Sequence, residues 1–127
     1  MRREFALGPE DIRALDAFGC PWETIICGSV RWLLIHGYAI IAGYDVEQAE
    51  VAIRLDSYPA GMIDMVYFNP PLARADGKVI NNLSALTVDG KSFQQWSRHY
   101  GWRQGIDSLC THLRRVRGWL KHELKKR

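Results

Sequence analysis

The stretch that decides the fold reads Tyr58-Pro59-Ala60-Gly61-Met62-Ile63-Asp64-Met65-Val66-Tyr67-Phe68-Asn69-Pro70-Pro71. Within it, Met62–Phe68 predicts a β-strand, because apolar and aromatic residues dominate and the two following prolines must end the pairing. Before it, Ala49–Leu55 alternates apolar and polar residues, which predicts a half-buried strand. The chain between these two strands is too short for a helix, so we expect them to pair antiparallel.

Two more strands and a helix precede this pair. Trp22–Cys27 is rich in β-branched residues, and the turn signal Gly28-Ser29 separates it from a predicted partner strand, Val30–His36. Pro9–Phe18 predicts a short helix, since proline suits a first helical turn and Gly19 is a plausible stop. We therefore expect a meander of four antiparallel strands after an N-terminal helix.

The second half of the chain predicts an irregular segment and a long helix. Periodicity fades from Leu72 to Gly105, and so long an irregular segment in a small domain is usually functional. From Ile106 to Lys125 apolar residues recur with helical spacing, at Ile106, Leu109, Cys110, Leu113, Val116, Leu120 and Leu124. The predicted class is α+β, with this helix packed on one face of the meander.

Composition narrows the function classes. The 127 residues suit one domain spanning 1–127, and a net charge of +3 is too small to require a nucleic-acid partner. No apolar run is long enough to cross a membrane, and no apolar region follows the basic N-terminus as in a signal peptide. The cysteines (Cys20, Cys27 and Cys110) lack metal-site spacing and are interpreted as free thiols. We expect a cytoplasmic protein without a metal or cofactor.

Several motifs, in their order, are similar to a known family. They are Trp32-Leu33-Leu34-Ile35-His36, Gly43-Tyr44, Tyr58-Pro59, Asp89-Gly90-Lys91-Ser92-Phe93-Gln94-Gln95-Trp96-Ser97-Arg98-His99, and Gly101-Trp102-Arg103-Gln104-Gly105 before a helix. This pattern resembles the ubiquitin-conjugating (UBC) fold, where a tyrosine-proline turn links the third and fourth strands and an irregular active-site segment follows. Within that fold it resembles the prokaryotic family-E branch, over roughly residues 9 to 124.

The resemblance implies a place in a bacterial ubiquitin-like modification pathway. Its implied partners are a ubiquitin-like protein, the activating enzyme of that pathway and a JAB-type peptidase from the same operon. A typical UBC enzyme also has a nucleophilic cysteine shortly after a glycine. Here Gly90 is the best match for that glycine, which puts Phe93 where the cysteine would be, and no cysteine lies between Cys27 and Cys110. Thioester chemistry therefore needs another residue, or is absent.

Three residues are candidates for catalysis. Cys110 is the cysteine nearest the irregular segment, although its place on the apolar helix face favours a core thiol over a nucleophile. His99 has a side chain suited to general acid–base work. Ser92 offers a hydroxyl, which would need an adjacent base to act as a nucleophile.

The segment Asp89–Trp102 is the expected functional region. Trp96, Arg98, Tyr100 and Trp102 are residue types typical of protein-binding hot spots, and the same residues could instead form a packed cap over the sheet. Three hypotheses follow: a transfer enzyme, a non-catalytic UBC variant that binds the ubiquitin-like protein or its activating enzyme, and a small nucleic-acid-binding module that uses its basic C-terminus.

Overall fold

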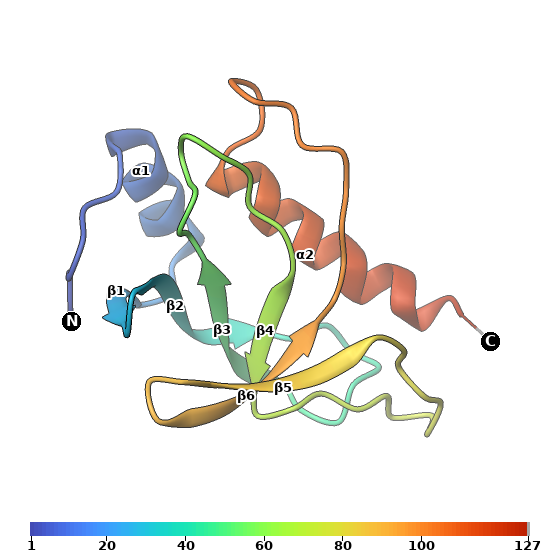
Figure 1. Cartoon of the computed structure of the whole chain (residues 1–127). Coiled ribbons are helices and arrows are strands. Elements are labelled where there is room, and N and C mark those ends of the chain that lie inside the picture. The colour runs from blue at the N-terminus through green and yellow to red at the C-terminus, as the bar shows by residue number, and fades with distance from the viewer. Residues whose placement is uncertain (127) are drawn as a thin grey trace.

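A computed structural model of the chain describes residues 1–126, which form two helices and six strands (Figure 1). The helices are α1 (Pro9–Phe18) and α2 (Leu109–Leu124). The strands are β1 (Trp22–Cys27), β2 (Val30–Ala39), β3 (Gln48–Arg54), β4 (Val66–Asn69), β5 (Leu83–Val88) and β6 (Lys91–Trp96). The α+β class and the bounds of α1 are confirmed. Neither described helix is long and apolar enough to cross a membrane.

The sheet has six strands, so the prediction of four was wrong. Its order is β1-β2-β3-β4-β6-β5, and every neighbouring pair is antiparallel. The predicted meander is present as β1 to β4. β4 begins at Val66 rather than Met62, because residue 65 has a φ of 61° and interrupts the extended backbone.

The two additional strands lie inside the segment predicted to be irregular. β5 and β6 form a hairpin whose two turn residues, Asp89 and Gly90, have φ angles of 52° and 73°. Such left-handed pairs twist a two-residue hairpin in the same sense as its strands. Most of β5 is exposed, so it lacks the apolar alternation by which a half-buried strand is recognised.

The C-terminal helix starts three residues later than predicted. The Ser108 side chain accepts from the Thr111 amide, and the Thr111 hydroxyl accepts from the Ser108 amide at 2.7 Å, so this capping box begins α2 at Leu109. Ile106 therefore lies outside the helix and is 66% exposed, not on its apolar face as predicted. At the other end, the buried Arg74 guanidinium donates to the carbonyl oxygens of Glu123 (2.7 Å) and Lys126 (3.0 Å).

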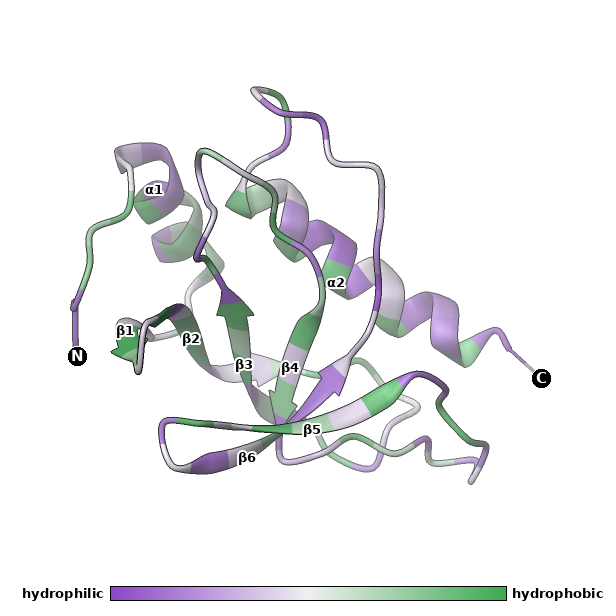
Figure 2. Ribbon diagram, viewed as in Figure 1, coloured by the Kyte–Doolittle hydropathy of each residue, from purple (hydrophilic) through white to green (hydrophobic). Residues whose placement is uncertain are grey.

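Each face of the sheet carries its own hydrophobic cluster. Figure 2 shows hydrophobic residues along β3 and β4 in the middle of the sheet, and alternating hydrophobic and hydrophilic residues along α2. The helices cover one face, where Leu113, Val116 and Leu120 of α2 are buried. The opposite face buries a second cluster, comprising Ile25, Trp32, Leu34, Ala52, Tyr67, Val88 and Phe93.

The β5–β6 hairpin closes this second cluster. It crosses the lower ends of β3 and β4 at a steep angle (Figure 1), and its Val88 and Phe93 side chains belong to the cluster. The Arg2 guanidinium joins Glu23 of β1 at 3.0 Å to Asp89 of the hairpin turn at 2.7 Å. These hydrogen bonds from Arg2 lower the pKa of Glu23 to about 2. Arg2 thus links β1, at one edge of the sheet, to the turn of the β5–β6 hairpin at the other edge.

Candidate functional site

His99 and Asp64 form an exposed acid–histidine pair. The His99 Nδ1 atom lies 3.0 Å from the Asp64 carboxylate, and the His99 side chain is 60% exposed. Asp64 comes from the loop before β4, whereas His99 lies three residues after β6. The amide of Met65 donates to the Arg98 carbonyl at 3.1 Å, which holds these two segments side by side. The carboxylate orients the imidazole, so His99 is placed to accept or donate a hydrogen bond through Nε2.

A buried histidine contacts the residues next to this pair, Met65 and Tyr100. His112 of α2 lies with its Nε2 atom 2.9 Å from the Met65 carbonyl oxygen and its Nδ1 atom 3.1 Å from the Tyr100 hydroxyl. A carbonyl can only accept, so Nε2 carries the proton and Nδ1 accepts from Tyr100. Burial lowers the pKa of His112 to about 4, so the ring is neutral at pH 7.

The buried histidine predicts a specific loss of stability in mild acid. The pKa of His112 is lowered from 6.5 to about 4, so below pH 6.5 the unfolded chain binds a proton that the folded chain excludes. Its contribution is complete above pH 6.5 and is lost as the pH falls towards 4. We expect urea titrations to show that the wild type loses about 2–3 kcal/mol more unfolding free energy than His112→Gln between pH 7 and pH 4. Parallel pH profiles would contradict this.

Aromatic side chains pack around Tyr100, the residue that follows His99. The Tyr100 ring centroid lies 6.1 Å from that of Trp102 and 5.9 Å from that of Trp119, and the Arg115 guanidinium lies 4.6 Å above the Tyr100 ring. All three aromatic residues are half-buried, so part of each remains on the surface. We use the name His99 surface for Asp64, His99, Tyr100, Trp102, Arg115 and Trp119.

The Tyr-Pro turn positions the start of α2 beside this surface. The Tyr58 hydroxyl donates to Asp11 of α1 at 2.9 Å and accepts from the Leu109 amide, at the first residue of α2, at 3.2 Å. Trp102 meets the Tyr58 ring edge to face at 6.3 Å. One tyrosine thus fixes both helices and one member of the His99 surface.

Two residues predicted to bind a partner lie largely inside the fold. Trp96 is 0% exposed and packs edge to face against Phe68 at 5.4 Å, so it cannot reach a partner. Arg98 is mostly buried and pairs with the buried Glu123 at 3.1 Å. These two residues form the packed cap that was the alternative interpretation, while Tyr100 and Trp102 remain on the surface.

The three catalytic candidates do not meet. With about 3.6 residues per turn, Cys110 lies on the opposite side of α2 from His112, Arg115 and Trp119. Cys110 is half-buried and borders a pocket facing α1, so it is neither a core thiol nor a neighbour of His99. Ser92 is exposed on β6, and none of the described residues offers its hydroxyl a base.

The position implied for a UBC nucleophile is occupied by a core residue. Phe93 is 0% exposed within the cluster under the hairpin, so even a cysteine there would be sealed from a partner. No three histidine, cysteine, aspartate or glutamate side chains in residues 1–126 are arranged to hold a metal ion.

Sequence reasoning missed His112 and Asp64. His112 falls between Leu109, Leu113 and Val116 on the buried face of the helix, and that periodicity was a usable signal for a buried histidine. Asp64 carried no such signal, because its pairing with His99 spans 35 residues.

Comparison with known proteins identifies the family. The family model for prokaryotic E2 family E matches residues 7–123, which include every strand and almost all of α2. No curated protein and no solved structure gave a significant match. The match agrees with the helix–sheet–helix order, the Tyr-Pro turn and the tryptophan before the last helix. The chain therefore belongs to prokaryotic E2 family E, a family of the ubiquitin-conjugating fold.

Proposed function

We propose that this protein binds a ubiquitin-like protein non-covalently in a bacterial modification pathway, as an E2-like component that forms no thioester. The observation that carries the proposal is the His99 surface, which concentrates residue types common in binding hot spots and includes no cysteine. Family membership supports an E2-like role in general, with a ubiquitin-like protein and an activating enzyme as partners. The absence of a thiol from this surface favours binding over transfer.

The chemistry of the His99 surface suits protein recognition. Trp102, Trp119 and Tyr100 offer aromatic area, and Arg115 adds a cation beside them. Tryptophan, tyrosine and arginine dominate binding hot spots because they combine buried area with directed hydrogen bonds. The hydrogen bonds of His112 and Arg98 hold the segment in place before binding, which reduces the entropy lost on association.

The two other hypotheses have less support. Cys110, the cysteine considered for transfer, borders a pocket that faces away from the His99 surface. For a nucleic-acid module, the arginines of α2 would need to form one basic stripe. Instead Arg115 lies over Tyr100, while Arg114 and Arg117 border the pocket on the other side of the helix.

The decisive experiment mixes the protein with the ubiquitin-like protein and the activating enzyme of its operon, with and without ATP. We expect calorimetry to detect a complex with the ubiquitin-like protein alone, and non-reducing gels to show no thiol-sensitive adduct on this chain. Arg115→Ala should raise the dissociation constant at least tenfold, because it removes the exposed cation over Tyr100.

A matched control is available on the other helix. Arg13 is also an exposed helical arginine but lies on α1, so Arg13→Ala should bind like the wild type. A thiol-sensitive adduct that disappears in Cys110→Ser would overturn the proposal in favour of a transfer enzyme. Equal affinities for the wild type and Arg115→Ala would remove the His99 surface as the binding site.

A further inference from the structure

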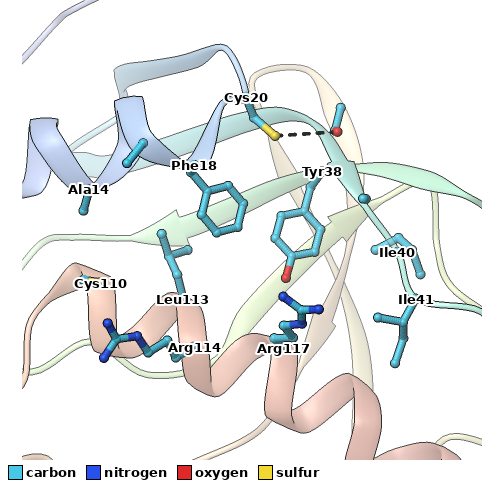
Figure 3. Close-up of a pocket in the computed structure, with 13 residues that line it drawn as sticks. Ala14, Phe18, Cys20, Tyr38, Ile40, Ile41, Cys110, Leu113, Arg114 and Arg117 are labelled. Atoms are coloured by element: carbon cyan, nitrogen blue, oxygen red, sulfur yellow. Dashed lines mark hydrogen bonds between the residues drawn. The ribbon is translucent and has the colours of Figure 1, made fainter.

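A pocket of about 550 Å³ lies between α1, the end of β2 and α2 (Figure 3). We call it the helix pocket; it is bordered by Ala14, Ala17, Phe18, Cys20, residues 37–41, Cys110, Leu113, Arg114 and Arg117. Its volume falls within the range of about 300–1,000 Å³ that is typical of small-molecule sites. It lies on the side of α2 opposite the His99 surface, so it is a separate feature from the proposed partner site.

The walls of the helix pocket are mainly apolar. The small side chains of Ala14 and Ala17 leave space between the two helices, and Ile40, Ile41 and Leu113 complete the lining. The Phe18 ring stacks on the Tyr38 ring, with centroids 5.6 Å apart and planes at 17°. These surfaces suit a hydrocarbon chain, which is favoured wherever it is removed from water.

Tyr38 offers a hydroxyl to the pocket without a partner. The residue as a whole is 4% exposed, and its hydroxyl, which borders the pocket, forms no hydrogen bond to any of residues 1–126. The hydroxyls of the other four tyrosines all have partners: the Leu120 carbonyl for Tyr44, Asp11 for Tyr58, the Met65 sulfur for Tyr67 and His112 for Tyr100. Among the described residues, Glu50 Oε1 is the one buried side-chain nitrogen or oxygen without a partner, so the Tyr38 hydroxyl is open to the pocket rather than sealed in the core. Figure 3 shows the Tyr38 hydroxyl directed towards Arg117, an exposed residue that borders the pocket.

Two exposed cations border this part of the pocket. Arg114 and Arg117 both border the pocket, and neither forms an ion pair with a carboxylate among the described residues. No lining residue is acidic. The carbonyl of Gly37 already accepts from the Cys20 thiol at 3.7 Å. The charged side chains of the lining are therefore both cations, and the Tyr38 hydroxyl can donate beside them, which matches an anion with acceptor oxygens.

We propose that the helix pocket binds a small apolar carboxylate, such as a medium-chain fatty acid. The hydrocarbon chain would lie between α1 and the end of β2, against Ala14, Ala17 and Ile40. The carboxylate would accept hydrogen bonds from Arg117 and from the Tyr38 hydroxyl, with Arg114 adding positive charge. The inference needs no assumption about the ubiquitin-like partner.

The test uses laurate to displace the fluorescent probe 11-(dansylamino)undecanoic acid from the full chain, below the micelle concentration of laurate. We expect laurate to compete, and 1-dodecanol to bind at least tenfold more weakly because it lacks the charge. Arg117→Gln should weaken laurate binding at least tenfold, and Tyr38→Phe several-fold. Ala17→Trp should fill the pocket and abolish binding of both ligands.

The matched control is Arg115→Gln, which changes an arginine on the opposite side of the same helix and should leave laurate binding unchanged. Arg117 is exposed, so Arg117→Gln remains folded and informative even if Ala17→Trp does not fold. No displacement by millimolar laurate would overturn the proposal, as would wild-type affinity in Arg117→Gln. Equal binding of dodecanol and laurate would overturn the carboxylate assignment.

Discussion

Trp96→Ala is expected to lower the free energy of unfolding by about 3–5 kcal/mol, the usual cost of truncating a buried aromatic side chain. Trp96 is fully buried, meets Phe68 at 5.4 Å and Tyr44 at 6.1 Å, and donates from Nε1 to the Gln94 side chain at 2.8 Å. The substitution would leave a cavity where β6 joins the helix-covered face of the sheet. Guanidinium denaturation followed by circular dichroism measures the loss.

A second tryptophan provides the comparison. Trp102 is half-buried on the His99 surface, so Trp102→Ala should cost clearly less stability and instead weaken binding of the ubiquitin-like protein. If Trp96→Ala kept near-native stability but lost binding, Trp96 rather than Trp102 would face the partner.

Glu123→Ala is expected to cost a similar amount, about 3–5 kcal/mol, because it leaves the Arg98 guanidinium without its anion and the buried Arg74 with Asp76 alone. The Glu123 side chain is 2% exposed and lies 3.1 Å from Arg98 and 3.9 Å from the buried Arg74. Arg74 also fastens the last carbonyls of α2. We expect thermal and chemical denaturation to show a lower midpoint.

Glu123→Ala should also weaken binding at the His99 surface, although Glu123 is not part of that surface. Arg98 directly precedes His99, and without Glu123 its side chain loses the contact that fixes this segment to α2. Glu123→Ala should therefore also weaken partner binding. The control is Glu47→Ala, at an exposed position before β3, which should change neither property. Stability within about 0.5 kcal/mol of the wild type for Glu123→Ala would show that the Glu123 ion pairs contribute little.

Local patterns predicted the parts of the fold that local physics determines. Pro9 and Gly19 mark the ends of α1, and the helical spacing of Leu113, Val116 and Leu120 identifies the face that is buried. β-Branched content, the Gly28-Ser29 turn and the alternation of Ala49–Leu55 located β1 to β3 to within a few residues. The order of motifs around Tyr58-Pro59 also predicted the family that the comparison confirms.

Other features depend on contacts between distant residues and had no local signature. β5 has one buried residue, so its strand conformation comes from pairing with β6 rather than from its own pattern. The hairpin reaches β1 through Arg2 and Asp89, 87 residues apart in the chain. A strand that gains its stability from its neighbour cannot be recognised from its own six residues.

For the candidate site too, some features were predictable from the sequence and others depend on tertiary contacts. The sequence alone predicted that function concentrates in the segment Asp89–Trp102, since aromatic, arginine and histidine residues gather there. Only the tertiary structure decided that Trp96 is buried, that Asp64 pairs with His99, and that Cys110 lies across α2 from both. Residue type and spacing describe what a segment can do. Burial and pairing depend on which distant element packs against that segment. Here α2 packs across the sheet and contacts the segment through His112 and Glu123.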